Sequence, residues 1–219
     1  MFNVRIAQSA ALGKWPELHT LTLAQVKQRQ AQGTRIALST PIIGASGRLS
    51  IGLSFETLQD LHEFRQRNVA DPKFQEFVAR ISPLLAAPAE TEIWEVILPA
   101  QQGDAPAYVQ AITWTAQDGE GPALRAALLE RMKRRQGEGL RCALAEQVAG
   151  GAYRLGLNIL LGSLGELEAN RNKNRNDASF QEFGRRMAEI TTSTEVTIAE
   201  VLVPFQPVGR RELAGAASR

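Results

Sequence analysis

Apolar and polar residues alternate along several short segments of the chain. In residues 48–54, Leu49, Ile51 and Leu53 occupy every second position, and polar or small residues stand between them. This period of two is typical of a strand with one buried face. Related patterns predict further strands, which we place at residues 3–8, 35–39, 92–98, 108–115, 155–159 and 197–203.

Other segments have the spacing of amphipathic helices. Leu124, Leu128 and Met132 fall on one face of a helix expected at residues 123–138, and its counterpart is expected at residues 17–32. Asp71 is followed by a proline, which is typical of an N-cap and a first helical turn, so another helix should begin there. Asp177 provides the same cap later in the chain.

The chain contains an internal repeat. An offset of 106 residues aligns residues 13–80 with residues 119–186 without a gap, and 24 of the aligned positions are identical. With one residue deleted, residues 95–99 then match residues 200–204. Chance similarity does not continue ungapped over such a length, so the pattern indicates a tandem duplication.

The order of expected elements in each copy is strand, helix, two strands, helix and strand, which is the ferredoxin-like unit. Its helices cover one face of the sheet, so the other face also needs a cover. We therefore predict an α+β fold in which two repeats, residues 1–99 and 107–205, pack sheet to sheet as one intrachain barrel. Residues 100–106 are the expected linker, and residues 206–219 are expected to form a mobile tail.

Composition and charge limit the chemistry. The chain has 25 basic and 23 acidic residues, so we expect no nucleic-acid partner. Cys142 is the single cysteine, which excludes an intrachain disulfide framework and a cysteine-rich metal site. His19 and His62 are the only histidines, and the sequence has no Walker loop, GxGxxG, GxSxG or CxxC motif. We therefore expect no metal site and no cofactor.

The sequence also bears on the compartment. Its first residues lack the basic segment and apolar run of a secretory signal, and no segment approaches the roughly 18 apolar residues of a membrane helix. A single cysteine is consistent with a reducing environment. We expect a cytoplasmic protein without an integral membrane segment.

This layout resembles the dimeric α+β barrel superfamily. The helix start Asp-Pro-x-Phe-Gln-x-Phe at residues 71–77, preceded by Arg65, Arg67 and Asn68, is similar to the NIPSNAP family. The second copy departs from the family pattern at Ala178 and Gly121. Residues 13–15, Gly-Lys-Trp, resemble a short motif that many such proteins carry after the first strand. The resemblance implies a space between the sheets that often holds a small molecule. It implies no particular reaction, since members include cofactor-free oxygenases, isomerases and haem enzymes.

Polar residues on the middle strands form the candidate ligand site. They lie opposite the apolar face, which in an α+β barrel would direct them to the interior, where small neighbours leave room for a ligand. Taken singly, each arginine is more readily explained by a solvated sheet face or by a strand end that reaches water. The candidates on these strands are Arg35, Arg48, Arg141, Arg154 and Asn158.

Glu95 and Glu200 complete the candidate site. They occupy equivalent positions in the last strand of each copy, and these strands are apolar on both faces, as expected for strands covered on both sides. A buried lone carboxylate is costly unless it is neutralised or paired. We hypothesise that both glutamates face the barrel and pair with some of the four arginines, although such pairs are more often structural than catalytic.

Three functions are compatible with these features. The leading hypothesis is a NIPSNAP-like barrel protein that binds a small apolar or aromatic molecule between its two sheets. The second is a cofactor-free oxygenase or isomerase that uses the same cavity, and the third is a non-catalytic interaction scaffold with a filled barrel. The sequence leaves open whether the protein is an enzyme and whether the intrachain pair of repeats forms a homodimer.

Overall fold

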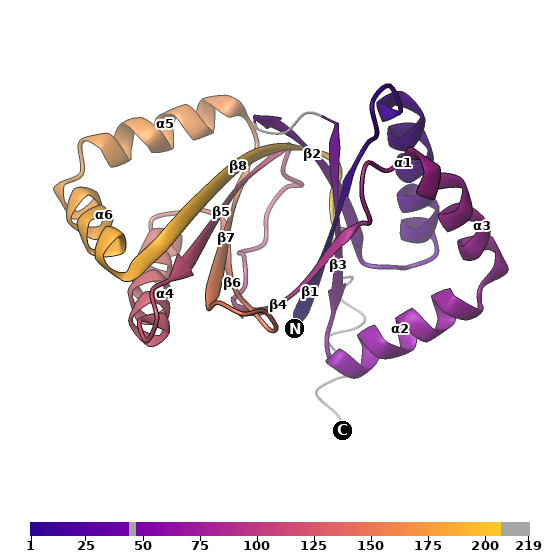
Figure 1. Cartoon of the computed structure of the whole chain (residues 1–219). Helices are drawn as coiled ribbons and strands as arrows, with labels where there is room; N and C mark the ends of the chain where they lie inside the picture. The colour runs from indigo at the N-terminus through magenta and orange to yellow at the C-terminus, as the bar shows by residue number, and fades with distance from the viewer. Residues whose placement is uncertain (44–46, 207–219) are drawn as a thin grey trace, which may run out of the picture.

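The computed structural model describes residues 1–43 and 47–206 of the chain. These residues form eight strands that close into one barrel in the order β1-β3-β2-β8-β5-β7-β6-β4. Six α-helices lie outside the barrel, three on each side (Figure 1). The predicted α+β class and the single intrachain barrel are therefore confirmed. The expected tail lies outside the described residues, apart from Gln206.

The elements follow the predicted repeat. The first copy contains β1 (Phe2–Ser9), α1 (Trp15–Ala31), β2 (Ile36–Ile43), β3 (Arg48–Phe55), α2 (Leu58–Ala70), α3 (Pro72–Ile81), a short 3-10 turn (Ser82–Leu84) and β4 (Glu90–Leu98). The second copy contains β5 (Tyr108–Ala116), α4 (Gly121–Gly137), β6 (Cys142–Gln147), β7 (Arg154–Leu161), α5 (Leu164–Arg175), α6 (Ala178–Ile190) and β8 (Thr191–Val203). No helix of the described residues is both long and apolar enough to span a bilayer.

Each copy has two helices where the simple ferredoxin-like order has one. Asp71 ends α2 and caps α3, because its carboxylate accepts a hydrogen bond from the backbone N–H of Lys73 at 3.0 Å. Asp177 does the same for α6 through the N–H of Ser179 at 2.9 Å. The N-caps predicted at these aspartates are confirmed, and each cap divides the outer layer into two shorter helices.

Turn chemistry at the end of the first helix of each copy also follows the sequence. Gly33 and Gly139 have φ angles of 86° and 89°, a backbone region that side chains with a Cβ disfavour. Each follows the C-cap residue of its helix, α1 or α4, and lets the chain turn back into the next strand.

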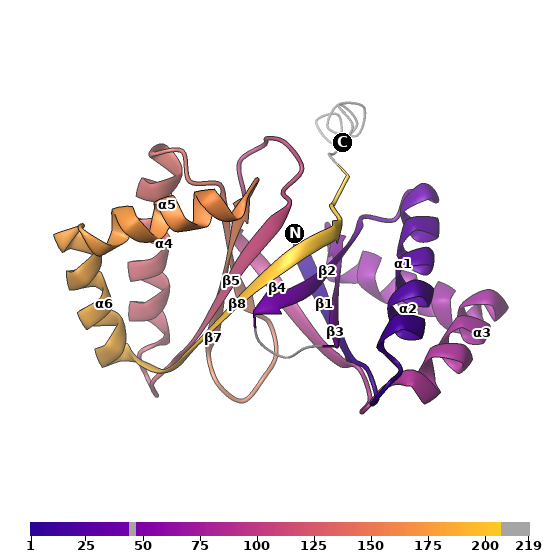
Figure 2. The ribbon, with the colours of Figure 1, turned by 90° about the horizontal axis from the view of Figure 1, so that it is seen from above.

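The last strand of each copy joins the two copies into one barrel. Within the first copy β4 pairs with β1, and on its other side it pairs with β6 of the second copy. In the same way β8 pairs with β5 and with β2. All these pairings are antiparallel, so the sheet continues from one copy into the other at two places. Seen from above, the strands cross between the two groups of helices (Figure 2).

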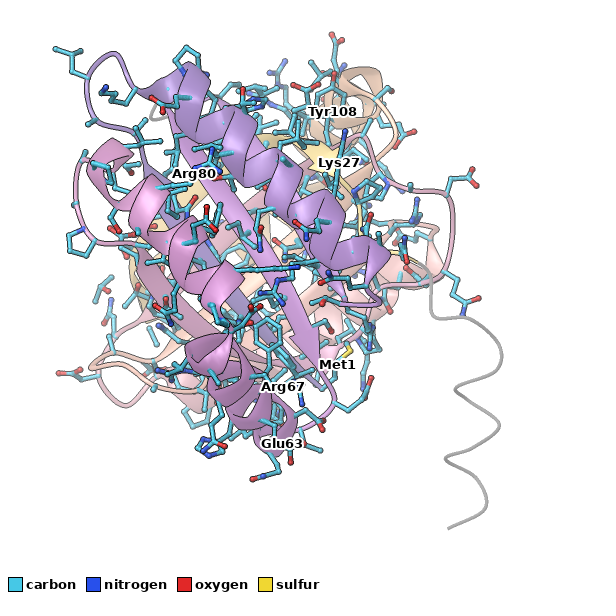
Figure 3. The ribbon with its side chains drawn as sticks, turned by 90° about the vertical axis from the view of Figure 1, so that its right-hand side faces the viewer. Met1, Lys27, Glu63, Arg67, Arg80 and Tyr108 are labelled. Atoms are coloured by element: carbon cyan, nitrogen blue, oxygen red, sulfur yellow. The ribbon has the colours of Figure 1, made fainter. Side chains whose placement is uncertain are left out.

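The main hydrophobic cores lie between the helices and the outer face of the barrel. Leu18, Leu38 and Leu49 are fully buried in the first core, and their counterparts in the second core are fully buried as well, at Leu124, Leu144 and Leu155. Figure 3 shows the outer helices of the first copy, with Glu63 and Arg67 on α2 and Arg80 on α3. Because apolar burial is directed outward, the inner face of the barrel is available for other residue types.

We predict that neither copy folds alone as a monomer. A chain cut after Gly103 loses the partners of β2 and β4, and unpaired strand edges associate readily with other chains. The fragment is expected to dimerise or aggregate in size-exclusion chromatography, whereas co-expression of both halves should restore a heterodimer. A monomeric first half that unfolds cooperatively in urea would contradict the single-barrel interpretation.

Candidate ligand site inside the barrel

The two-residue period of the strands assigns each side chain to one face of the barrel. Leu49, Ile51 and Leu53 belong to the core beneath the helices, so the alternate residues of β3 face inward. In β4, Trp94 is opposite Asn3 and Glu92 is opposite Arg5 in the register with β1. Directly opposed residues of an antiparallel pair share a face, so inward-facing side chains can be followed from strand to strand.

A cavity of about 270 Å³ lies on this inner face. Both copies contribute to it, through β1, β3 and β4 on one side and β7 and β8 on the other. Apart from Ala7 its lining is charged, with three arginines and three glutamates: Arg5, Arg48, Arg154, Glu90, Glu92 and Glu195. The charges balance formally, so the cavity offers both cationic and anionic partners to a ligand.

Ion pairs connect these side chains into a network. Arg154 is central to it, with Nη1 at 3.0 Å from Glu92 Oε1 and Nη2 at 3.8 Å from Glu195 Oε2. Arg5 Nη1 lies 3.4 Å from the other oxygen of Glu92, and Arg48 Nη2 lies 2.6 Å from Glu90 Oε2. The Arg154–Glu92 contact crosses between the copies, so it also helps to hold them together.

The network partly repeats the internal symmetry of the chain. By the offsets found in the sequence, Arg48 corresponds to Arg154, and Glu90 corresponds to Glu195. Each copy therefore supplies one arginine and one glutamate in contact to the same cavity. The cavity lies between equivalent residues of the two copies, which is where the pseudo-two-fold relation between them places a shared site.

One aromatic side chain contributes to this site from the first copy. The guanidinium of Arg154 lies 5.7 Å from the ring centroid of Trp94, and the indole N–H of Trp94 points to Glu92 at 3.4 Å. The ring passes so close to Gly156 that an added Cβ would lie 3.2 Å from it. A glycine at this point of β7 therefore allows the tryptophan to fill the space beside the cavity.

The prediction that Glu95 and Glu200 face the barrel interior is wrong. Glu95 shares the face of Ile93, which packs in the first hydrophobic core, and Glu200 shares the face of Ile198, which packs in the second copy. Both glutamates are exposed on the outer face, and among the described residues neither has an ion pair or a side-chain hydrogen bond. The carboxylates that pair with Arg48 and Arg154 are on the same two strands, nearer their N-terminal ends. They are Glu90 and Glu92, five and three residues before Glu95, and Glu195, five residues before Glu200.

The other expected site residues are divided between two locations. Arg48 and Arg154 line the cavity. Arg35 and Arg141 precede their strands and lie outside it, because Arg35 pairs with Glu56 at 2.7 Å and Arg141 packs against Gly103 of the linker segment. Asn158 follows the inward register of β7 opposite Ala111, but it is exposed and does not line the cavity.

Four charged cavity residues were not predicted: Arg5, Glu90, Glu92 and Glu195. A signal for two of them is present, since Glu90 and Glu195 match at the same offset as the last strands. It could have been followed by extending the expected strands toward their N-terminal ends. Arg5 and Glu92 have no charged counterpart in the second copy, so the repeat gives no indication of them.

Two titratable groups of the second copy have raised pKa values. Burial raises the pKa of the Cys142 thiol to about 11, so this residue stays protonated and behaves as a small core side chain. Burial also raises the pKa of Tyr153 to about 12, with a further contribution from Glu146. In the described part of the chain, no three His, Cys, Asp or Glu side chains are arranged to share a metal ion.

We predict that the network stabilises the barrel and that the outer glutamates do not. Arg154→Met keeps the aliphatic stem but leaves Glu92 with Arg5 alone, and should lower the free energy of unfolding by about 1–3 kcal/mol. The matched change Glu200→Gln should remain within about 0.5 kcal/mol of the parent. Urea denaturation measures the free energy of unfolding of both variants. Equal losses in Arg154→Met and Glu200→Gln would show that the ion-pair network does not stabilise the barrel.

We also predict an alkaline loss of stability that depends on Cys142. The thiol has a raised pKa in the folded state, so above pH 9 only the unfolded chain releases its proton. The free energy of unfolding should then fall by about 1.4 kcal/mol per pH unit up to about pH 11. Cys142→Ala should show a shallower decrease, measured by urea denaturation at each pH. Identical slopes for the parent and the variant would contradict this assignment.

No family model and no curated protein matches this sequence. Among solved structures, a candidate monooxygenase from Fusobacterium nucleatum is similar over 95% of both chains, with a TM-score of 0.73 and 7% identity. An anthrone oxidase-like protein is similar over 93% of this chain and 92% of its own, with a TM-score of 0.65 and 14% identity. A NIPSNAP domain protein from Burkholderia xenovorans covers 48% of this chain and 99% of its own, with 22% identity and a TM-score of 0.40.

These similarities concern the fold, since the sequence identities are low. The structural neighbours include NIPSNAP-domain proteins, and those that align along most of the chain include candidate monooxygenases, an anthrone oxidase-like protein and a haem-binding protein from Thermus thermophilus. The chain therefore has the fold of the dimeric α+β barrel proteins, with both halves of the barrel in one polypeptide.

Proposed function

We propose that this protein binds a small polar molecule in the cavity between its sheets, with Arg48 and Arg154 holding an acidic group of the ligand. The observation that carries the proposal is the convergence of these two equivalent arginines, one from each copy, on a single cavity. A guanidinium can hold a carboxylate through two parallel hydrogen bonds, which favours an acid over an alcohol or an amide.

The character of the cavity changes the ligand class expected from the sequence. Ligands with large apolar surfaces are bound in pockets lined mainly by hydrophobic and aromatic side chains. Here Ala7 is the apolar member of a lining that is otherwise charged, and Trp94 lies beside the cavity rather than in its lining. A volume of about 270 Å³ also favours a compact ligand. We therefore expect a short polar acid rather than an apolar aromatic compound.

Two glutamates can give way to such a ligand. The side chains of Glu90 and Glu195 are 74% and 70% exposed, so they can turn into solvent at small cost when a ligand acid replaces them. Arg48 also keeps a buried Nε–H that has no hydrogen-bond partner among the described atoms. Glu92 is less exposed and contacts both Arg5 and Arg154, so it would remain and hold Arg154 in place.

An enzymatic role is the alternative. The proteins that share the fold along the whole chain include candidate monooxygenases and an anthrone oxidase-like protein, so oxidation of an organic compound without a cofactor is a second hypothesis. It requires turnover, which binding alone does not. The scaffold hypothesis instead requires that no small molecule bind in the barrel.

The first test identifies what the protein retains. Native mass spectrometry of the purified protein, followed by extraction, should reveal a bound small acid. Thermal unfolding with acetate, succinate and benzoate should then show stabilisation that saturates with concentration, by about 2.7 kcal/mol at one hundred times the dissociation constant. Succinate and acetate should act more strongly than benzoate. Product formation from the retained compound in air would favour the enzymatic alternative.

The second part uses a matched pair of variants. Arg48→Gln removes a cavity guanidinium, whereas Arg35→Gln removes an arginine that pairs with Glu56 outside the cavity. We predict at least a tenfold loss of acid binding for the first variant and less than a twofold change for the second. Similar losses in both, or no stabilisation by any of the acids, would reject the proposal.

A further inference from the structure

A second concave site lies outside the barrel, between α4 and α6 of the second copy. These two helices are neighbours in the outer layer on the side away from the first copy (Figure 1). The groove between them has a volume of about 240 Å³, and three arginines line it: Arg131, Arg134 and Arg186. It shares none of its lining residues with the cavity in the barrel.

Arg131 forms a buried cationic part of this groove. Its side chain is only 6% exposed, and its guanidinium lies 5.0 Å from the ring centroid of Phe180 and 4.7 Å from that of Phe183. Nη1 donates to the carbonyl of Ser179 at 3.4 Å. Nη2 has no hydrogen-bond partner among the described atoms, and Asp177 lies 3.8 Å from it. Its charge is thus incompletely compensated.

The neighbouring helix ends have a local excess of cations. The single carboxylate of Glu138 contacts three cationic side chains, at 2.8 Å from Arg135, 3.0 Å from Lys173 and 4.0 Å from Arg134. Arg134 also donates through Nη2 to the hydroxyl of Ser179 at 3.1 Å, which turns it toward the groove. Burial, followed by the nearby charge of Arg134, lowers the pKa of Arg131, so an anion between the two would relieve their repulsion.

Carboxylates at the edge of the groove do not neutralise it. Glu130 and Glu182 are both exposed, and Glu182 pairs with Arg185 on its own helix. Exposed ion pairs are weak and readily replaced, so these side chains can move away from an incoming anion. The arginines and the Ser179 hydroxyl remain as donors in the lining of the groove, and Arg134, Ser179 and Arg186 are exposed there.

The first copy does not have this arrangement. The residues equivalent to Arg131 and Arg134 are Gln25 and Gln28, and only Arg186 has a basic counterpart, at Arg80. There Arg29 pairs directly with the helix-capping Asp71 at 3.0 Å, so cation and carboxylate satisfy each other. The incompletely paired arginines are therefore a property of the second copy and not of the fold.

We propose that the groove between α4 and α6 is a second binding site, which takes a tetrahedral oxyanion such as a phosphoryl group. Planar guanidiniums and a hydroxyl donor match the several acceptor oxygens of this group. The phosphoryl group can belong to free phosphate or to a phosphate ester, and Phe183, which lines the groove, provides apolar surface for the organic part of an ester.

The test is isothermal titration of the full chain with inorganic phosphate at constant ionic strength. Arg134→Gln, which introduces the residue of the first copy, and Arg186→Ala should each weaken binding at least tenfold. Arg80→Ala is the matched control, since it changes the equivalent exposed residue of the first copy (Figure 3), and should change the affinity less than twofold. Arg48→Gln, a change in the barrel cavity, should also leave this binding intact.

Phenyl phosphate distinguishes the two sources of the group. Tighter binding than inorganic phosphate assigns the site to a phosphate ester, and equal binding assigns it to the free ion. Arg80, Arg134 and Arg186 are exposed, so circular dichroism and thermal unfolding should show an intact fold for these three variants. The proposal is rejected if phosphate gives no saturable heat, or if Arg80→Ala weakens binding as much as Arg186→Ala. If Arg48→Gln is the only variant that loses phosphate binding, the phosphate site lies in the barrel cavity and the proposal is rejected.

Discussion

The pairing of each copy's last strand with the other copy is the constraint on which this structure depends. β4 connects β1 to β6, and β8 connects β5 to β2, so the hydrogen-bond ladder closes only when both copies are present. Closure removes the exposed edges that a single four-stranded sheet would have. It also directs one face of every strand to a shared interior, while the helices cover the other face.

The chemistry of that interior follows from closure. Apolar residues are used on the outer face, where Leu49 and Leu155 pack under helices, so the inner face can carry charge. Equivalent residues of the two copies then meet, which is how Arg48 and Arg154 come to line one cavity. The Arg154–Glu92 ion pair joins the two copies at this cavity, so the proposed binding and the closure of the barrel would depend on some of the same side chains.

The repeat and the hydrophobic periodicity were sufficient to predict the fold. Equivalent leucines such as Leu38 and Leu144 are buried to the same extent, and the caps at Asp71 and Asp177 form as their residue types indicate. The face of β4 could not be predicted in the same way, because both of its faces are largely covered and alternation alone gives no inward direction. Only the register with β1, which places Ile93 opposite Val4, shows that Glu95 points outward.

The two copies differ where the candidate sites lie. In the cavity, Arg5 and Glu92 of the first copy correspond to Ala111 and Thr197, so one half supplies the additional ion pair and the other supplies smaller side chains. A symmetric cavity would present two identical halves to any ligand, whereas this one gives Arg154 two carboxylates and Arg48 one. A ligand acid would therefore meet less competition at Arg48. The core residues common to both copies give them the same fold. The charged residues present in only one copy make the cavity asymmetric.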